Sequence, residues 1–303
     1  MKKCCVICNR HSGHGITDEL LNRIKNTLED YNYEADIVFT KKPKDGTNII
    51  KNLDYHDLVI SIGGDGTFGE VVNGNVLRKK PLLLSHLPHG TTNDIAHSYG
   101  LNKSLILNLK AVLEGKIVEI DVPTINGFPF IYVCGYGKFM DVSYDTPQHI
   151  KNHLGKMAYL IAGVKDFFVP PKSYNVRYYV NGKKYEGRYT IFIISNSTSI
   201  AGFKNFYTKD VDLTDKKVEV AMIYSKNRTH LFNTMLELVT GGATNVKGSI
   251  KYKTKKFEIE FLDEMDKKWC TDGDKIDTNV NKFTFEVKHR VNLLVPKHMS
   301  FKK

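Results

Sequence analysis

The chain lacks the features that mark secreted and membrane-spanning proteins. Its 303 residues include five cysteines, a low and odd number that argues against a disulfide framework and fits a reducing compartment. No apolar run approaches the ~20 residues needed to span a bilayer. The N-terminal stretch from Met1 to Cys8 is too short for the apolar part of a signal peptide. We therefore expect a cytoplasmic protein.

Signatures of several binding sites are also missing. No Gly-x-x-x-x-Gly-Lys-Ser/Thr loop occurs, so a P-loop lysine is excluded. One His-x-x-x-His spacing occurs, at His149 and His153, and we assign none of the histidines a role. Cys4, Cys5 and Cys8 lie on one expected strand, where Cys5 points away from the other two. We interpret all three as buried strand residues.

Acidic residues are outnumbered by basic ones. The 44 lysines and arginines exceed the 33 aspartates and glutamates, which leaves a formal charge of +11 that attracts phosphates, nucleic acid or anionic lipid. Without a zinc finger, helix-turn-helix or aromatic-rich basic strand, we expect no nucleic-acid partner. Lysines near an anionic membrane each contribute ~1 kcal/mol of attraction. They are densest at Lys247, Lys251, Lys253, Lys255, Lys256, Lys267 and Lys268.

The chain does contain a glycine-rich turn directly after an apolar run. Residues 57–60 form that run, and Gly-Gly-Asp-Gly-Thr follows at residues 63–67. Glycines let backbone N–H groups approach phosphate oxygens, and a helix that follows presents its positive end to an anion. The turn therefore predicts phosphate binding by backbone and metal. The alternative is an ordinary connection between a strand and a helix.

A second turn of the same kind follows the next expected strand. The apolar residues 81–87 lead into Pro-His-Gly-Thr-Thr-Asn-Asp-Ile-Ala at residues 88–96. In open parallel sheets, ligands bind at the edge where the carboxyl ends of the strands meet. We therefore expect both turns at the same sheet edge.

The two turns together resemble the diacylglycerol kinase catalytic family, which includes bacterial soluble lipid kinases, sphingosine kinases and ceramide kinases. Asn-Arg-His-Ser-Gly at residues 9–13 is similar to the family's opening Asn-Pro-x-Ser-Gly, and Asp-Gly-Asp at residues 272–274 to its late Asp-Gly-Glu. The resemblance spans essentially the whole chain. It implies a three-layer α/β N-terminal domain, related to NAD kinase and phosphofructokinase, and a C-terminal antiparallel β-sandwich.

The patterning along the chain fits these two architectures. Strand and helix patterns alternate at first, with Thr17 as a helix cap. Asn-Gly pairs at residues 126–127 and 181–182 then predict hairpins. Helices are expected within this β-rich part at residues 153–168 and 229–239.

The expected domain boundary lies where the pattern changes. We expect a nucleotide-binding α/β domain at residues 1–122 and a β-rich lipid-substrate domain at residues 123–295. The resemblance implies that residues 296–303 return to the first domain. Because no linker-like segment marks the boundary, we expect the domains to abut, with the site in the cleft between them.

The resemblance implies ATP as the phosphoryl donor, bound at the strand ends. For Thr40 alone, a role as a cap or turn residue is the alternative. The residues that would line the nucleotide are Asn9, Ser12, Gly13, Thr40, Gly63, Gly64, Asp65, Gly66, Thr67, Phe68, Gly69, Glu70, Thr91 and Asn93.

Three carboxylates, Asp65, Asp94 and Asp121, follow successive expected strands. Unpaired, they would raise each other's pKa, and a divalent cation or its hydration shell removes that cost. The resemblance implies a network of aspartates, water and Mg²⁺ here. Separate caps and turns are the alternative.

A second, structural Mg²⁺ is implied at residues 212–218. By resemblance Asp215 supplies its carboxylate, and Asp212 and Lys217 supply backbone oxygens. Lys216 stands where the family has glycine and brings a positive charge to this position. A solvated turn is the alternative.

The late turn offers two candidates for the catalytic base. Phosphoryl transfer to an alcohol needs a carboxylate that accepts the hydroxyl proton. The resemblance assigns this role to Asp274, although its side chain is one methylene shorter than the family's glutamate. Asp272 is the reserve candidate.

The sequence thus predicts an ATP- and Mg²⁺-dependent lipid kinase that converts diacylglycerol to phosphatidic acid. It would work as a cytoplasmic protein peripherally associated with the inner face of an anionic membrane. The alternatives are a kinase for a sphingoid base, ceramide or undecaprenol, an NAD kinase, and a non-catalytic nucleotide-binding protein of the membrane surface. A homodimer, usual among the bacterial relatives, is left open.

Overall fold

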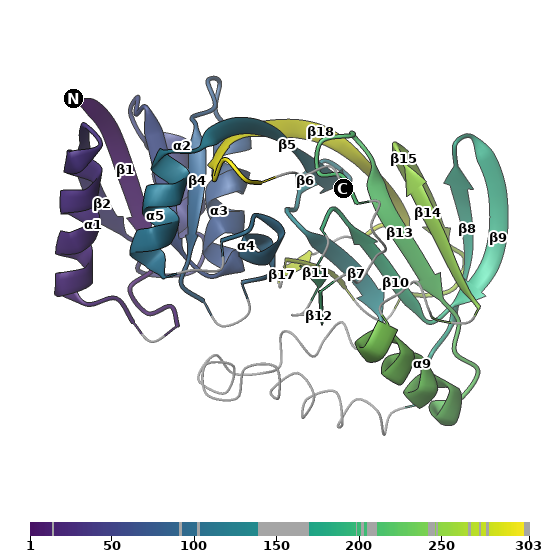
Figure 1. Cartoon of the computed structure of the whole chain (residues 1–303). Coiled ribbons are helices and arrows are strands. Elements are labelled where there is room, and N and C mark those ends of the chain that lie inside the picture. The colour runs from purple at the N-terminus through teal and green to yellow at the C-terminus, as the bar shows by residue number, and fades with distance from the viewer. Residues whose placement is uncertain are drawn as a thin grey trace. The chain divides into compact units, whose positions relative to one another are not determined.

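The structure is a computed structural model that divides into two compact units (Figure 1). Unit 1 holds Met1–Ile120 and the described chain from His289 on, and unit 2 holds Asp121–Lys288. The helix expected at residues 153–168 lies outside the described residues. The structure describes residues 1–13, 15–90, 93–101, 104–138, 170–197, 199–200, 203–204, 211–241, 246, 248–265, 268–272, 274–276 and 279–299.

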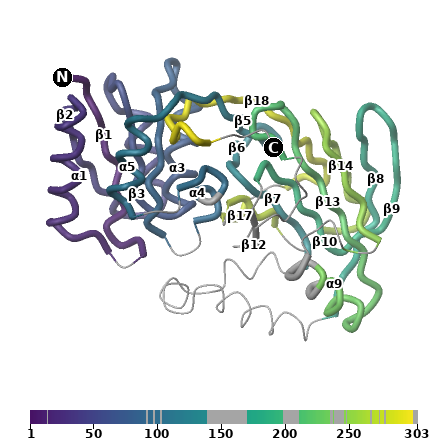
Figure 2. Tube along the Cα trace, viewed as in Figure 1, coloured from purple at the N-terminus to yellow at the C-terminus, as the bar shows by residue number. Residues whose placement is uncertain are grey.

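Unit 1 is built on a parallel sheet in the order β2-β1-β3-β4. The last part of β18 (Lys282–Val295), yellow in Figure 2, returns to this sheet, where Leu293 pairs with Leu84 of β4. Every residue of β3 is buried, as expected for a parallel strand covered on both faces. The strands are β1 (Lys2–Cys8), β2 (Tyr33–Phe39), β3 (Leu58–Gly63) and β4 (Leu84–Pro88).

Among the described residues of unit 1, five helices accompany this sheet, and α1 packs with α5, α2 with α3 and α3 with α4. The predicted cap of the first helix is confirmed, because the Thr17 hydroxyl accepts the N–H of Leu20 at 3.2 Å. The three cysteines of β1 are buried, as predicted. The helices are α1 (Asp18–Asp30), α2 (Asp45–Asn52), α3 (Asp65–Val76), α4 (Asp94–Ser98) and α5 (Leu105–Leu113).

Unit 2 is an antiparallel β-sandwich. One sheet runs β14-β13-β10-β7-β16-β17, and the other contains β15, β8 and β9 beside the first part of β18. The predicted second helix is confirmed as α9 (Arg228–Gly241). The strands are β5 (Lys116–Ile125), β6 (Phe128–Pro129), β7 (Val133–Gly137), β8 (Tyr174–Val180), β9 (Lys183–Tyr189), β10 (Ile191–Ser195), β11 (Ser199–Ile200), β12 (Phe203–Lys204), β13 (Val218–Ile223), β14 (Ser249–Thr254), β15 (Lys256–Phe261), β16 (Trp269–Thr271) and β17 (Asp274–Ile276).

Aromatic side chains fill the core between the two sheets of unit 2. Tyr136 from one sheet meets Phe261 from the other with ring centroids 4.8 Å apart, and Trp269 meets Phe285 at 5.0 Å. Rings in such contact bury large apolar areas and dominate the packing of the core. The sequence's single tryptophan is therefore a core residue, fully buried.

Two hairpins form where the Asn-Gly pairs predict them. Asn126 and Gly127 have φ angles of 48° and 87°, and Asn181 and Gly182 have 50° and 78°. Positive φ at both central residues gives the turn twist that matches paired strands. These hairpins join β5 to β6 and β8 to β9.

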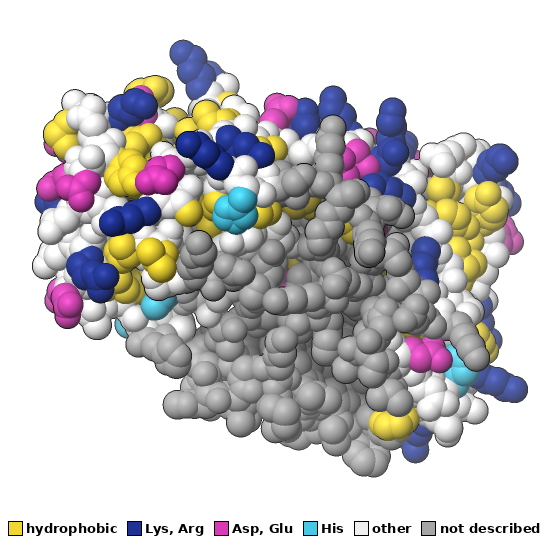
Figure 3. All heavy atoms as spheres, viewed as in Figure 1, with side chains coloured by type: hydrophobic (Ala, Val, Ile, Leu, Met, Phe, Trp, Pro, Cys, Tyr) yellow, Lys and Arg dark blue, Asp and Glu magenta, His cyan; other side chains and the backbone are white. Residues whose placement is uncertain are grey.

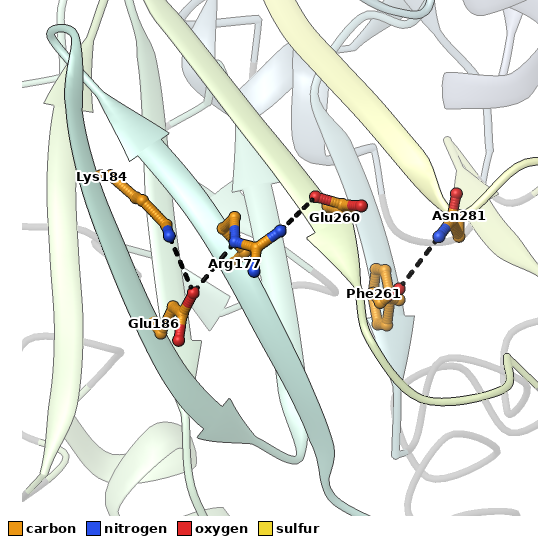
Figure 4. A network of polar contacts seen from close by, with 6 residues as sticks. All are labelled: Arg177, Lys184, Glu186, Glu260, Phe261 and Asn281. Carbon is orange, nitrogen blue, oxygen red and sulfur yellow. Dashed lines mark hydrogen bonds and ion pairs between the residues drawn. The ribbon is translucent and has the colours of Figure 1, made fainter.

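Charged side chains link three strands of unit 2 (Figure 4). Arg177 of β8 pairs with Glu186 of β9 at 2.9 Å and with Glu260 of β15 at 3.3 Å. Lys184 joins Glu186 from the same strand at 3.2 Å. Because these groups are partly exposed, we assign them to cross-strand pairing and solubility.

The fold class predicted from the sequence is confirmed: a parallel α/β unit is followed by an antiparallel sandwich. A search of the described residues for a helix long and apolar enough to cross a membrane finds none.

Candidate functional site

The two glycine-rich turns of unit 1 touch each other through their backbones. Gly63 at the end of β3 pairs with Pro88 at the end of β4, and the N–H of His89 donates to the carbonyl of Gly63 at 2.7 Å. A Cβ added to Gly90 would lie 2.5 Å from the Cα of Gly64. Only glycine allows this approach, so the two motifs form one surface at the carboxyl edge of the sheet.

Asp65 ties the second turn to the first. It is the first residue of α3, and its two carboxylate oxygens accept the backbone N–H groups of Asp94 at 2.9 Å and Ile95 at 3.0 Å. These N–H groups open α4 and have no partner within that helix. The carboxylate therefore caps α4 from the neighbouring motif.

Asn93 closes the second turn on itself. Its side chain accepts the N–H of Gly90 at 2.9 Å and donates to the carbonyl of the same glycine at 2.8 Å, while its own φ is 53°. Asparagine tolerates this left-handed conformation better than most residues. Thr91, which was expected to contact the nucleotide, lies outside the described residues.

Gly66 differs from its neighbours, because no heavy atom lies within 4 Å of a Cβ built at this position. It is exposed in the first turn of α3, where helix N–H groups have no partner within the helix. The fold gives no packing reason for a glycine there. A ligand that approaches the backbone closely at this position would explain why residue 66 is a glycine.

The first loop also reaches the two turns. The side-chain amide of Asn9 donates to the hydroxyl of Thr67 at 3.4 Å, and His89 donates to the carbonyl of Gly15 at 2.9 Å. A Cβ on Gly13 would stand 2.6 Å from the carbonyl oxygen of His89. Unit 1 thus gathers Asn9, Gly13 and both turns in one place, as the resemblance predicts. Ser12 is partly buried in the same loop.

Other residues expected at the nucleotide have side chains committed to the fold. The ring of Phe68 is fully buried and stacks on His86 at 4.8 Å. The carboxylate of Glu70 accepts the N–H groups of Lys44 at 2.8 Å and Gly46 at 2.9 Å and so holds the start of α2. Gly69 is buried within α3. Thr40 follows β2 directly, and its N–H donates to the carbonyl of Cys8 at 3.0 Å.

The three carboxylates expected around Mg²⁺ belong to different units. Asp65 and Asp94 lie in unit 1, where Asp94 is 1% exposed. Asp121 opens unit 2, and its carboxylate accepts the N–H of Lys216 at 2.5 Å. Within the part of the chain that the structure describes, no three His, Cys, Asp or Glu side chains are grouped as metal ligands. Both carboxylate oxygens of Asp65 are engaged by backbone N–H groups of α4.

The loop expected to hold the structural Mg²⁺ does not fit a divalent cation. One carboxylate oxygen of Asp212 accepts the N–H and the hydroxyl of Thr214, at 2.9 and 2.7 Å. Asp215 accepts the N–H of Lys217 at 3.0 Å, and its other oxygen lies 2.8 Å from the ammonium of Lys253. The carboxylates of Asp212 and Asp215 are therefore already engaged by protein donors.

The two candidate bases have very different surroundings. The carboxylate of Asp272 accepts three backbone N–H groups, from Ile131 at 2.5 Å, Tyr132 at 3.0 Å and Val133 at 3.1 Å. Burial raises the pKa of Asp272 to about 6, and the charge of Asp274 adds to the rise, while the three N–H groups oppose it. Asp274 begins β17 and is exposed. Asp272 thus anchors the start of β7, and Asp274 is accessible to a substrate.

Two buried titratable residues near these loops were not predicted from the sequence. Burial lowers the pKa of His86 to about 3, so this residue is a neutral packing partner that hydrogen-bonds Ser61 at 2.9 Å. Burial also raises the pKa of Glu219 to about 8, against the opposing charge of Lys253. Glu219 on β13 lies opposite Lys253 on β14. The sequence could not predict this pair, because it depends on the register of the two strands.

The dense lysine segment is less uniformly exposed than the sequence suggests. Lys253 pairs with two acidic side chains and Lys256 with one. Lys255 is exposed, and Lys247 and Lys267 lie outside the described residues. Figure 3 shows Lys and Arg side chains spread over the visible face, not gathered in one patch.

Comparisons with known proteins agree with the motifs. Residues 3–125 match the model of the diacylglycerol kinase catalytic domain. The diacylglycerol kinase of Bacillus subtilis (strain 168) is 29% identical over 269 residues, which is 88% of each chain. The diacylglycerol kinase of Staphylococcus carnosus (strain TM300) is 27% identical over 87% of this chain and 86% of its own.

Solved structures show the same fold. A crystal structure of a diacylglycerol kinase from Bacillus anthracis strain Sterne has a TM-score of 0.75 and 20% identity, with 97% of each chain covered. A second structure from this strain reaches 0.80 with 23% identity, covering 97% of this chain and 95% of its own.

We expect Asp65→Ala to destabilise the protein, because two N–H groups of α4 lose their acceptor. The free energy of unfolding in urea should fall by ~1–2 kcal/mol, and Asp65→Asn should lose less because it keeps one acceptor oxygen. Gly66→Ala is the matched control in the same helical turn and should be neutral or stabilising by ~0.5–1 kcal/mol. Equal stability of Asp65→Ala and wild type would contradict the capping role.

Asp272→Asn should also destabilise the protein, since an amide offers one acceptor oxygen to three N–H donors. We expect a loss of ~1–3 kcal/mol in the free energy of unfolding. Asp274→Asn, two residues away and exposed, should stay within ~0.5 kcal/mol of wild type. Similar losses in both variants would show that the turn responds to any change of charge.

Proposed function

We propose that the chain, which is similar to diacylglycerol kinases over 88% of its length, transfers the γ-phosphoryl group of ATP to the free hydroxyl of diacylglycerol and produces phosphatidic acid. Mg²⁺ accompanies the nucleotide. The observation that carries this proposal is the contact of two glycine-rich turns at the carboxyl edge of a parallel sheet, beside the open first turn of α3.

The phosphate-handling half of the reaction belongs to unit 1. Backbone N–H groups at the start of α3 bind phosphate oxygens, and Gly66 lets them come close. Asp65 and Asp94 would orient the water shell of a Mg²⁺ ion, and the ion would supply positive charge to offset that of the transferring group. This arrangement uses no P-loop lysine, in keeping with the sequence.

Asp274 supplies the proton acceptor. Its carboxylate takes the hydroxyl proton of the acceptor as the hydroxyl oxygen bonds to the γ-phosphorus. The bond between the γ-phosphorus and the β–γ bridging oxygen breaks, and ADP leaves. Asp272, held by three N–H groups, keeps the turn in shape.

Work on a lipid requires access to a membrane surface. A formal charge of +11 attracts the protein to anionic lipid without anchoring it. We therefore propose peripheral association with the cytoplasmic face of the membrane, which weakens as salt rises.

A transfer assay tests the proposed activity. Wild-type protein receives ATP labelled in the γ-phosphate and Mg²⁺, with diacylglycerol, a sphingoid base, ceramide or undecaprenol in mixed micelles, and with NAD as a parallel acceptor. Labelled phosphatidic acid is expected. If only NAD or a different lipid is labelled, that molecule is the acceptor in place of diacylglycerol. If no acceptor is labelled, the result favours a non-catalytic nucleotide-binding protein.

Gly66→Ala tests the backbone approach to phosphate. A methyl group at this open position should leave stability unchanged but raise the KM for ATP about tenfold, the cost of one weakened charge-assisted hydrogen bond. The KM for the lipid should not change. An unaltered KM for ATP would place the phosphates away from the start of α3.

Asp274→Asn tests the base. General-base catalysis contributes ~100- to 10,000-fold, so kcat should fall by that order while the KM for ATP changes little. Asp274→Glu restores the longer side chain of the family and should keep or raise the activity. Asp272→Asn, corrected for its folded fraction, is the control. If it abolishes turnover while Asp274→Asn is fully active, the two roles must be exchanged.

A further inference from the structure

We propose that the ammonium group of Lys253 replaces the structural divalent cation that the resemblance implies for the loop of residues 212–217. The loop is then held by an internal cation, and unit 2 keeps its shape without metal. This inference concerns the fold of unit 2 and does not depend on which lipid is phosphorylated.

The ammonium is placed by the strands themselves. Lys253 on β14 stands opposite Glu219 on β13 in the antiparallel register. Its nitrogen lies 2.8 Å from a carboxylate oxygen of Asp215 and 3.7 Å from one of Glu219. The side chains are 29% exposed for Lys253, 20% for Asp215 and 7% for Glu219. A charge pair shielded to this degree is ordered far better than a pair on the open surface.

The other acidic groups of the loop already have donors. Asp212 accepts two hydrogen bonds from Thr214, Asp215 accepts the N–H of Lys217, and Asp121 accepts the N–H of Lys216. The second carboxylate oxygen of Asp215 lies 2.8 Å from the ammonium of Lys253. These contacts account for the acidic side chains of the loop with protein donors.

A metal ion and this ammonium would compete for the same oxygen. Mg²⁺ binds carboxylate oxygen at ~2.1 Å and requires near-octahedral geometry, so it would stand within a few ångströms of the lysine nitrogen. Lys216, at the position of the family glycine, brings a further positive charge and has a φ of 59°. Lys216 and Lys253 both disfavour a divalent cation at Asp215.

The replacement confines the need for Mg²⁺ to the nucleotide. The loop joins Asp121 through two hydrogen bonds, because the N–H of Asp121 donates to the carbonyl of Leu213 at 2.8 Å and the carboxylate of Asp121 accepts the N–H of Lys216 at 2.5 Å. If the internal cation orders this loop, Asp121 is positioned before any metal arrives. In the absence of nucleotide, Mg²⁺ should then not stabilise the protein by binding at Asp215.

Thermal unfolding of the full chain without nucleotide tests the proposal, with EDTA or with millimolar Mg²⁺ alone. Lys253→Met should lower the Tm by roughly 5 °C or more, because it leaves the shielded carboxylate of Asp215 without its cation. Lys253→Arg, which keeps the charge, should retain most of the Tm. Lys251→Met is the matched control, because Lys251 lies on the same face of β14 and makes no ion pair among the described residues. This variant should change the Tm little.

Two comparisons decide between lysine and metal. If Mg²⁺ raises the Tm of the wild-type protein, it should raise the Tm of Asp215→Asn by the same amount, because the rise then comes from Mg²⁺ bound at another site. In the double variant Lys216→Gly, Lys253→Met, the loop should become able to use a metal, so Mg²⁺ should raise the Tm, and adding Asp215→Asn should abolish that rise. The proposal is overturned if Asp215→Asn removes a Mg²⁺ response from wild type, if Lys253→Met is as stable as wild type, or if the double variant ignores Mg²⁺.

Discussion

The candidate site depends on one close backbone contact, where Gly64 at the end of the first turn meets Gly90 in the second. No side chain fits between them, so two motifs that are separated along the chain become a single surface. The carboxylate of Asp65 fixes this contact by accepting two N–H groups of α4. The residue expected to serve the metal therefore also assembles the surface on which the nucleotide would bind.

This constraint separates the residues of the motif by role. Gly64 and Gly90 are explained by the approach of their backbones, whereas Gly66 has open space and no structural reason to lack a side chain. Glu70 holds the start of α2 through two hydrogen bonds, and Phe68 stacks on the buried His86. In unit 2, Asp272 holds a turn and leaves Asp274 exposed. In both units an acid or a ring engaged by the fold fixes a loop that presents an accessible residue.

The sequence predicted what local chemistry determines and missed what depends on distant partners. The Thr17 cap, the Asn-Gly hairpins and the parallel strands before each glycine-rich turn follow from short patterns, and the structure confirms them. Position in a motif could not show that Phe68 packs inward, because its partner His86 lies on another strand. Similarly, the Asp215 side chain was interpreted as a metal ligand because its partner, Lys253, is close only through the register of β13 and β14.

Hydrogen exchange of the backbone amides, measured with and without ATP and Mg²⁺, tests whether the joined turns form the phosphate-binding surface. Amides at the start of α3, around Gly66, have no helical partner and should exchange quickly in the free protein. Nucleotide should slow their exchange strongly, with a smaller effect in the second turn around Gly90. Unchanged exchange at both turns, with protection elsewhere when ATP is saturating, would contradict this assignment.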